Sequence, residues 1–133
     1  MERFRTVLTI NAVVLALYVI LLFFIPHLYW PLTGVEITPD LLWLSRLFAV
    51  LVAGYALLSW FMRQPEHSHF ARAFSGTAVF LWAGAGLLEL AWGLAMNRWA
   101  AAALVNIALG MLFALLFLPF VRSGANEMGK RMA

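Results

Sequence analysis

Four long apolar segments occupy most of the chain and constrain its fold more than any other feature. They cover approximately residues 6–25, 41–62, 71–94 and 99–121. A helix rises about 1.5 Å per residue, so a segment of about 20 residues can cross a hydrocarbon core of about 30 Å. Because lipid cannot satisfy an exposed backbone, each segment is expected to be a helix. The sequence therefore predicts an all-α integral membrane protein, a four-helix bundle forming one domain over residues 1–133.

The composition supports a membrane protein and excludes several other classes. Of the 133 residues, 65% are hydrophobic and 11% are charged, whereas about a quarter of the residues in a soluble domain are charged. The chain has no cysteine, which excludes disulfides, thiolate metal sites and a cysteine nucleophile. The net charge is +3, but the basic residues lie at the ends of the apolar segments. This distribution is typical of membrane topology, and we predict no binding to nucleic acid.

Lysine and arginine are distributed unevenly among the termini and loops. Seven lie before the first segment, at the ends of the loop between the second and third, or after the fourth: Arg3, Arg5, Arg63, Arg72, Arg122, Lys130 and Arg131. Only Arg98 lies in a loop on the other side. The positive-inside rule therefore predicts that both termini are cytoplasmic and that loops 26–40 and 95–98 face outward. The first segment is too long for the apolar part of a signal peptide, so we expect a retained helix.

Local signals refine the ends of the segments. Thr38 is suited to cap the second helix, with Pro39 at its first position and Asp40 favourable in its first turn. Pro119 is expected to end or bend the fourth helix. The stretch "IPHLYWPLTGVEI" could fold as a lid, although we favour an ordinary interfacial loop.

Four polar side chains, one on each segment, are predicted to lie at similar depth. Arg46 and Glu89 are roughly 8 Å outward of the centres of their segments, and Asn106 and Tyr18 are roughly 5 Å outward. Small residues recur beside three of them at helical spacing: Gly86, Glu89 and Gly93; Ala102, Asn106 and Gly110; Arg46, Ala49 and Ala53. Small residues mark faces where membrane helices approach closely, so these polar side chains are expected to point inward.

These positions predict an ion pair between Arg46 and Glu89 at the mouth of an outward-opening cavity. An unpaired charge at this depth costs about 3 kcal/mol on insertion scales, and pairing removes most of that cost. Asn106 and Tyr18 would complete the hydrogen bonds, while Trp43 and Trp82 would line the cavity. Such a pair also has a purely structural interpretation, in which it locks the helices in register without a ligand.

The other polar residues give weaker indications of a functional site. Asn11, Ser59 and Thr77 form a set in the inner half that interhelical hydrogen bonds explain. His67 and His69 form an H-x-H pair that can bind zinc or copper. They have no firm third ligand, so we predict no metal site. We also find no combination of residues that predicts a catalytic centre.

A family resemblance rests on the plan of four short helices, the proline- and aromatic-rich outer loop, and the opening of the second helix. That opening reads "LSRLFAVLVAGYALLSW", in which Gly54 follows Arg46 by eight positions. The pattern resembles small bacterial DoxX-like membrane proteins and related families of undefined function. The resemblance implies a location in the bacterial inner membrane. Some DoxX-type proteins are associated with quinone-linked sulfur oxidation or with complexes that handle redox stress, but the lack of cysteine argues against thiol or sulfane chemistry here.

Three classes of function fit these features. We favour an accessory or scaffolding subunit of a larger membrane complex, in contact with lipids and with other subunits or a second copy. The alternative is a binding protein or enzyme for a lipophilic molecule, such as a quinone, an isoprenoid or another lipid, held near Arg46 and Glu89. A small dimeric transporter is the least favoured class, because Glu89 lies in the third segment and is expected to be neutralised by Arg46. No cofactor is predicted, and a lipid or quinone is the candidate ligand.

Overall fold

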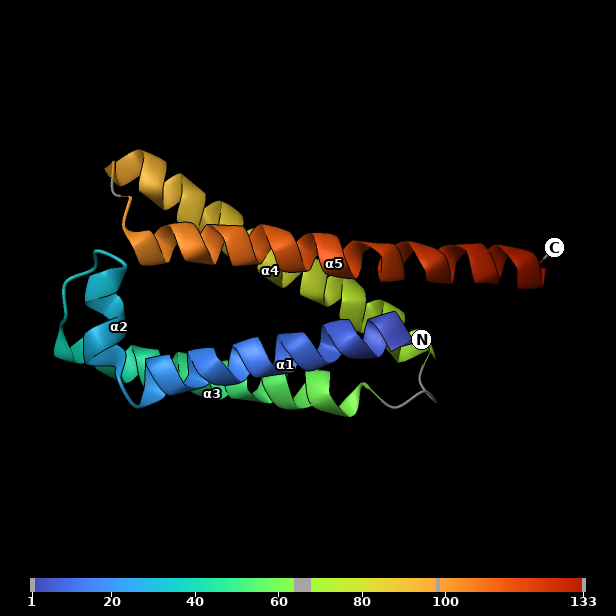
Figure 1. Cartoon of the computed structure of the whole chain (residues 1–133), viewed down its shortest axis with the longest axis horizontal. Helices are drawn as coiled ribbons and strands as arrows, with labels where there is room; N and C mark the ends of the chain where they lie inside the picture. Colours follow the sequence, from blue (N-terminus) through green and yellow to red (C-terminus); the bar gives the residue numbers. More distant parts are fainter. Residues whose placement is uncertain (1, 64–67, 98, 133) are drawn as a thin grey trace.

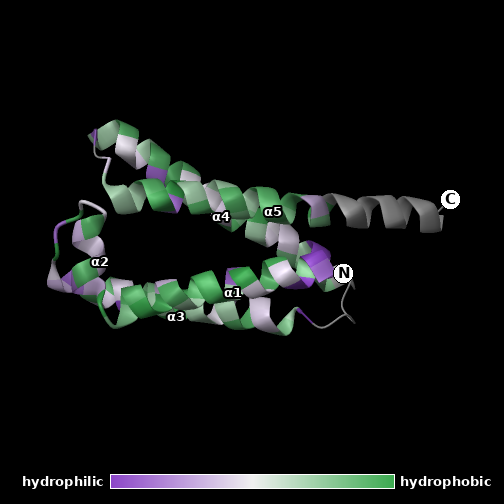
Figure 2. Ribbon diagram, in the orientation of Figure 1, coloured by the Kyte–Doolittle hydropathy of each residue, from purple (hydrophilic) through white to green (hydrophobic). Residues whose placement is uncertain are grey.

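The computed structural model describes residues 2–63, 68–97 and 99–132, and the side chains of 2–63, 70–97 and 99–121. These residues form five helices (Figure 1): α1 (Glu2–Phe23), α2 (Pro26–Leu32), α3 (Pro39–Phe61), α4 (Ser68–Met96) and α5 (Ala101–Met132). Four stretches are long and apolar enough to cross a membrane, namely Glu2–Phe23, Pro39–Phe61, Phe70–Met96 and Ala101–Val121. Figure 2 shows their hydrophobic character along most of each helix. The prediction of an all-helical protein with four candidate membrane spans is confirmed.

The observed helix ends confirm one local prediction and correct another. α3 begins as expected: the Thr38 hydroxyl accepts a hydrogen bond of 3.1 Å from the Leu41 N–H, and Pro39 and Asp40 occupy the first turn. Pro119 lies inside α5, which continues to Met132. Of the two effects expected of Pro119, to end or to bend the helix, the first is wrong. Proline removes only one donor, and the bonds of the flanking turns keep the helix continuous.

The short helix α2 lies where we had favoured an ordinary loop. Pro26 occupies its first turn, where a missing N–H has no cost, and Gly34 follows its C-cap residue Thr33 with a φ of +80°. Because Pro26 cannot donate to the Leu22 carbonyl four residues earlier, that carbonyl needs another donor. The hydroxyl of Ser45, in α3, donates to it at 2.8 Å. One side chain thus completes the end of α1 and joins it to α3.

The long helices are arranged as two close pairs. α1 packs along α3, and α4 packs along α5, as Figure 1 shows. Helix α2 contacts α1, α3 and α5 at the end of the molecule opposite the N terminus, which we call the α2 end. The N and C termini both lie toward the other end, which we call the terminal end. Helix α4 crosses α5 at an angle, approaching the α1–α3 pair near the terminal end and diverging from it toward the α2 end.

A continuous apolar core joins the two helix pairs. Its buried side chains come from α1, α4 and α5, and half-buried residues of α3 pack against them. Aromatic rings make the main contacts: Trp82 stacks on Phe113 with centroids 4.7 Å apart, and Tyr55 of α3 stacks on Phe74 of α4 at 5.3 Å. These contacts lie between helices and not toward lipid, so packing inside the protein determines how the two pairs meet.

The crossing of α4 and α5 depends on two glycines. A Cβ added at Gly110 would lie 2.7 Å from the Trp82 carbonyl oxygen and 3.0 Å from the Cα of Gly86. A Cβ at Gly86 would meet its nearest neighbours at 3.4 Å or more. The backbones therefore approach each other through Gly110, and the prediction that small residues mark close helix contacts is confirmed for these two helices.

Candidate functional site

A group of polar side chains connects three helices at the α2 end. The Tyr18 hydroxyl of α1 donates to the Asn106 Oδ1 of α5, and the Asn106 Nδ2 donates to the Tyr29 hydroxyl of α2 at 3.1 Å. The two tyrosine rings meet edge to face with centroids 6.3 Å apart. We call these three residues, together with Glu89, the α2-end cluster. The cluster uses both polar atoms of one amide to fasten α2 to the long helices.

Glu89 of α4 joins the same cluster. Its half-buried carboxylate interacts with the Asn106 side chain and electrostatically with Tyr18 and Tyr29. The structure thus brings together three of the four residues expected to converge: Tyr18, Glu89 and Asn106. Burial, and to a lesser extent Glu89, raises the pKa of Tyr29, while its hydrogen bond with Asn106 has the opposite effect. The Tyr29 hydroxyl therefore stays protonated at neutral pH.

Arg46 does not join the α2-end cluster. Its side chain is exposed, and within the described residues it forms no ion pair with Glu89 or any other carboxylate. The inward face of α3 contains Ser45 and Ala49, and Arg46 is displaced from Ser45 by about 100° around the helix. In addition, α4 diverges from α3 toward the α2 end, which separates the two helices at this depth (Figure 1). The expectation of an Arg46–Glu89 pair is corrected accordingly.

The two tryptophans expected to line a cavity have other surroundings. Trp43 is 63% exposed on the outside of α3, and Trp82 is buried in the core against Phe113. The Trp82 indole N–H donates to Asn11 Oδ1 at 2.8 Å, and Asn11 Nδ2 donates to the Ser59 hydroxyl at 2.7 Å. This second network connects α4, α1 and α3 through the fully buried Asn11. Neither tryptophan lines a site beside Arg46.

The inner polar set predicted from the sequence, Asn11, Ser59 and Thr77, is partly formed. Asn11 and Ser59 are bonded to each other as expected from interhelical hydrogen bonding. Thr77 is exposed, and its hydroxyl donates to the Ala73 carbonyl of its own helix at 3.0 Å. Trp82 replaces it as the third member of the network.

Tyr29 is not among the residues that the sequence predicts to converge. The signal that could have assigned it to the cluster is the proline on each side of "HLYW", Pro26 and Pro31, which favours a compact turn of helix over an extended loop. Its partner Asn106 cannot be identified from local sequence, because the two residues are 77 positions apart.

The α2-end cluster holds three helices together by hydrogen bonds, and the Glu89 carboxylate lies beside these bonds. Asn106 is engaged on both its oxygen and its nitrogen, so it has little capacity left for a ligand. No three His, Cys, Asp or Glu residues come together as a metal site in the part of the chain that is described. The side chains of His67 and His69 lie outside the described residues.

Comparisons with known proteins found no match to the chain among family models, curated proteins or solved structures.

Proposed function

We propose that the protein is an accessory or scaffolding subunit of a larger membrane assembly. In this proposal the exposed face of α3 around Arg46 contacts a neighbouring subunit. The observation that carries it is the exposure of Arg46, a permanently charged side chain, within an apolar span. The resemblance to DoxX-like proteins, some of which act in membrane complexes, supports the same assignment.

The surroundings of Arg46 within the chain make its exposure in a membrane costly. A charge in the membrane costs about 2.5–3.5 kcal/mol at mid-helix on insertion scales, and such residues almost always face protein or water. In α3, however, only 11% of the apolar window is buried within the chain. Trp43 and Val50, which share a helix face with Arg46, are 63% and 60% exposed. A partner subunit that offers an acceptor to Arg46 would cover this face and remove the cost.

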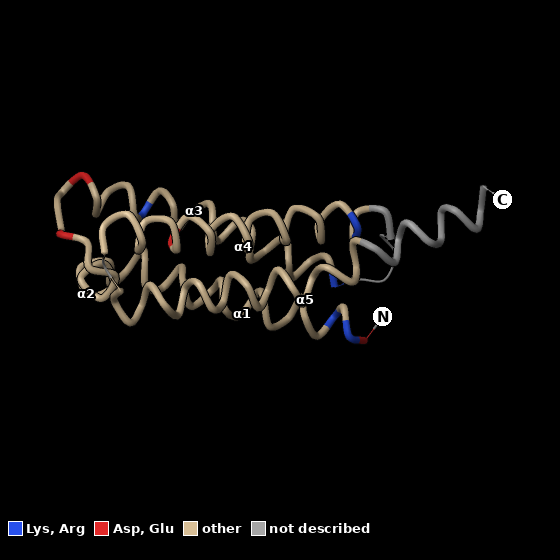
Figure 3. Tube along the Cα trace, turned by 90° about the horizontal axis from the view of Figure 1, so that it is seen from above, with Lys and Arg blue, Asp and Glu red and all other residues tan. Residues whose placement is uncertain are grey.

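The proposal includes the arrangement of the protein in its membrane. The four spans form a bundle in a bacterial inner membrane, with both termini and the loop between α3 and α4 in the cytoplasm. Figure 3 supports this orientation, since most described Lys and Arg residues lie at the terminal end. Reporter fusions after residue 133 and within loop 33–38 test it, with cytoplasmic and periplasmic signals expected respectively. Reversed signals contradict the orientation.

Photocrosslinking in native membranes tests the contact. A photoreactive amino acid at position 50 lies one turn from Arg46, and one at Leu17 is a matched control, because Leu17 is 55% exposed on α1. We expect a discrete protein adduct from position 50 and a weaker or different pattern from position 17. Arg46→Met should remove the adduct from position 50, whereas Arg46→Lys should retain part of it.

The competing account is that Arg46 extends along the helix and reaches lipid headgroups without any partner. In that case position 50 gives only lipid adducts, with or without Arg46, and the subunit proposal is wrong. An adduct with a second copy of the chain identifies a homo-oligomer as the assembly, and mass spectrometry of the adduct distinguishes this from a different subunit.

Binding of a lipophilic molecule remains the second candidate, and Glu89 is the observation that favours it. Its carboxylate lies within an apolar span, and no cation pairs with it among the described side chains. A quinone or isoprenoid with a hydroxyl group could donate to Glu89 while Tyr29 offers a protonated hydroxyl. Lipid analysis of the purified wild-type protein and Glu89→Gln tests this. Identical bound molecules in both proteins contradict a ligand site at Glu89.

A further inference from the structure

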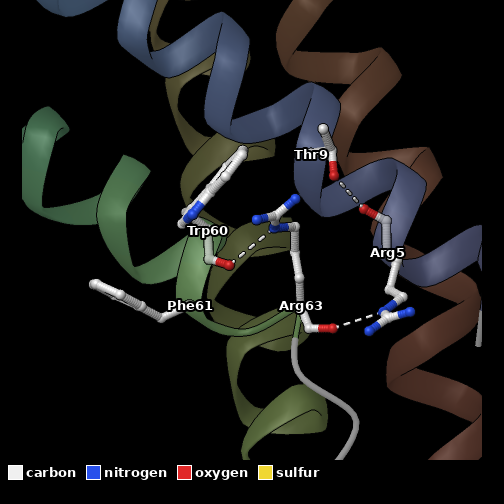
Figure 4. Close-up of a pocket in the computed structure, with 5 residues that line it drawn as sticks. All are labelled: Arg5, Thr9, Trp60, Phe61 and Arg63. Carbon is white, nitrogen blue, oxygen red and sulfur yellow. Dashed lines mark hydrogen bonds between the residues drawn. The ribbon is translucent and has the colours of Figure 1, made fainter.

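A pocket of about 460 Å³ lies near the terminal end, between the first turns of α1 and the end of α3. Figure 4 shows its lining, formed by Arg5, Thr9, Trp60, Phe61 and Arg63. The volume falls in the range of about 300–1,000 Å³ that is usual for small-molecule sites. The pocket is far along α1 from the α2-end cluster, so it is a separate feature of the molecule.

Backbone carbonyls hold the two arginines in place. The Nε of Arg5 donates to the Arg63 carbonyl at 2.9 Å, and the Nε of Arg63 donates to the Trp60 carbonyl at 3.0 Å (Figure 4). The Arg63 guanidinium also lies over the Trp60 ring, 3.2 Å from its centroid. These contacts use one N–H of each guanidinium, whereas a guanidinium has five. The terminal nitrogens of both side chains have no hydrogen-bond partner among the described residues, which leaves them available to a ligand in this part of the chain.

The charge of the pocket is positive. Among the described residues, neither Arg5 nor Arg63 forms an ion pair with a carboxylate. Guanidinium groups bind phosphate through paired N–H donors better than mobile lysines do, and the pocket lining contains two of them, which point to different sides of it (Figure 4). The lining therefore favours a phosphate group as ligand.

The apolar residues of the pocket indicate which phosphate compound fits. Trp60 and Phe61 are 47% and 64% exposed next to the arginines. They end an apolar span, where tryptophan is enriched at the level of lipid headgroups. A phospholipid places a phosphate against charged residues and its first acyl carbons against such rings, whereas free phosphate would leave the rings unused.

We propose that this pocket binds the phosphate group of a membrane phospholipid, with Arg5 and Arg63 as donors and Trp60 and Phe61 against the lipid's apolar part. The site is independent of the contact proposed for Arg46. It would hold a defined lipid in the leaflet at the terminal end.

Native mass spectrometry of the full chain, released from detergent with added palmitoyl-oleoyl-phosphatidylglycerol, tests the proposal. Each arginine near a membrane surface contributes about fivefold to affinity for an anionic lipid. The double variant Arg5→Met, Arg63→Met should therefore bind about 25-fold more weakly. The control Arg3→Met, Arg72→Met removes the same charge near the same end and should weaken binding much less, because neither side chain lines the pocket. Equal binding by wild type and the Arg5, Arg63 variant overturns the site, as does an equal loss in the control.

Two further measurements distinguish a phospholipid from free phosphate as the ligand and control for misfolding of the variants. Dioleoylglycerol, which lacks phosphate, should not bind, and excess inorganic phosphate should not displace the phospholipid. Displacement accompanied by phosphate adducts overturns the lipid assignment in favour of a free phosphate. If circular dichroism shows that the methionine variant is unfolded, Arg5→Lys with Arg63→Lys keeps the charge and loses the fork of donors. Severalfold weaker binding then supports the arrangement, and unchanged binding overturns it.

Discussion

Replacement of Gly110 by alanine should weaken the packing of α4 on α5. The new Cβ would lie 2.7 Å from the Trp82 carbonyl oxygen and 3.0 Å from the Gly86 Cα. Both are backbone atoms, so no flexible side chain can move to relieve the contact. An ordinary separation is about 3.5 Å, so the two helices would have to move apart by several tenths of an ångström.

The magnitude follows from two opposing effects. Overpacking costs about 1–3 kcal/mol, whereas glycine to alanine inside a helix gains about 0.5–1 kcal/mol. Gly110→Ala should therefore lower the free energy of unfolding by about 1 kcal/mol, within a range of about 0–2.5 kcal/mol. Gly54→Ala is the matched control, because nothing lies within 4 Å of its added Cβ. It should leave stability unchanged or raise it by up to about 1 kcal/mol.

Unfolding by sodium dodecyl sulfate from mixed micelles, followed by circular dichroism, measures both variants against wild type. Gly86→Ala should fall between them, since its Cβ would have neighbours at ordinary contact distances of 3.4 and 3.5 Å. The order of stability is therefore Gly54→Ala, Gly86→Ala, Gly110→Ala. If Gly110→Ala is as stable as Gly54→Ala, the helices do not cross in close contact at Gly110, and the argument is refuted.

Three further predictions concern the polar networks. Asn11→Leu should destabilise the protein by about 1–3 kcal/mol, because it removes two interhelical bonds and leaves the Trp82 N–H without an acceptor. In a double-mutant cycle Trp82→Phe should recover part of this loss. Purely additive effects would show that the two side chains are not coupled. Asn106→Leu should release α2, with faster amide hydrogen exchange in residues 26–34 than in wild type and unchanged exchange in the middle of α3; equal protection of α2 in both proteins contradicts its role as a clamp. The folded protein raises the pKa of Tyr29 above its usual value near 10, so the folded state keeps the hydroxyl proton to a higher pH than the unfolded state does. Stability should therefore fall as pH rises from about 10 toward the raised pKa. In a pH series of unfolding measurements, the Tyr29→Phe variant should lack this part of the pH dependence.

Much of the secondary structure is determined by the sequence alone. The length and apolarity of the four spans predict helices because lipid leaves no other way to satisfy the backbone. Thr38, Pro39 and Asp40 act within a single turn, so the start of α3 could be located from those residues. The close contact at Gly110 could also be anticipated, because glycine at a helix–helix crossing depends only on the absence of a Cβ.

The tertiary structure alone decided which polar groups meet. Depth in the membrane follows from the helical rise, which is why Tyr18, Glu89 and Asn106 could be expected to lie near one another. The helical rise does not specify which way a side chain points around the helix. Moving one residue along the helix turns the side chain by about 100°, and this places Arg46 outside while its neighbour Ser45 is buried. The tilt of α4 adds a second unknown, because it determines where along its length α4 can contact α3. Such tilts result from packing against all neighbouring helices at once, and no local pattern in the sequence specifies them.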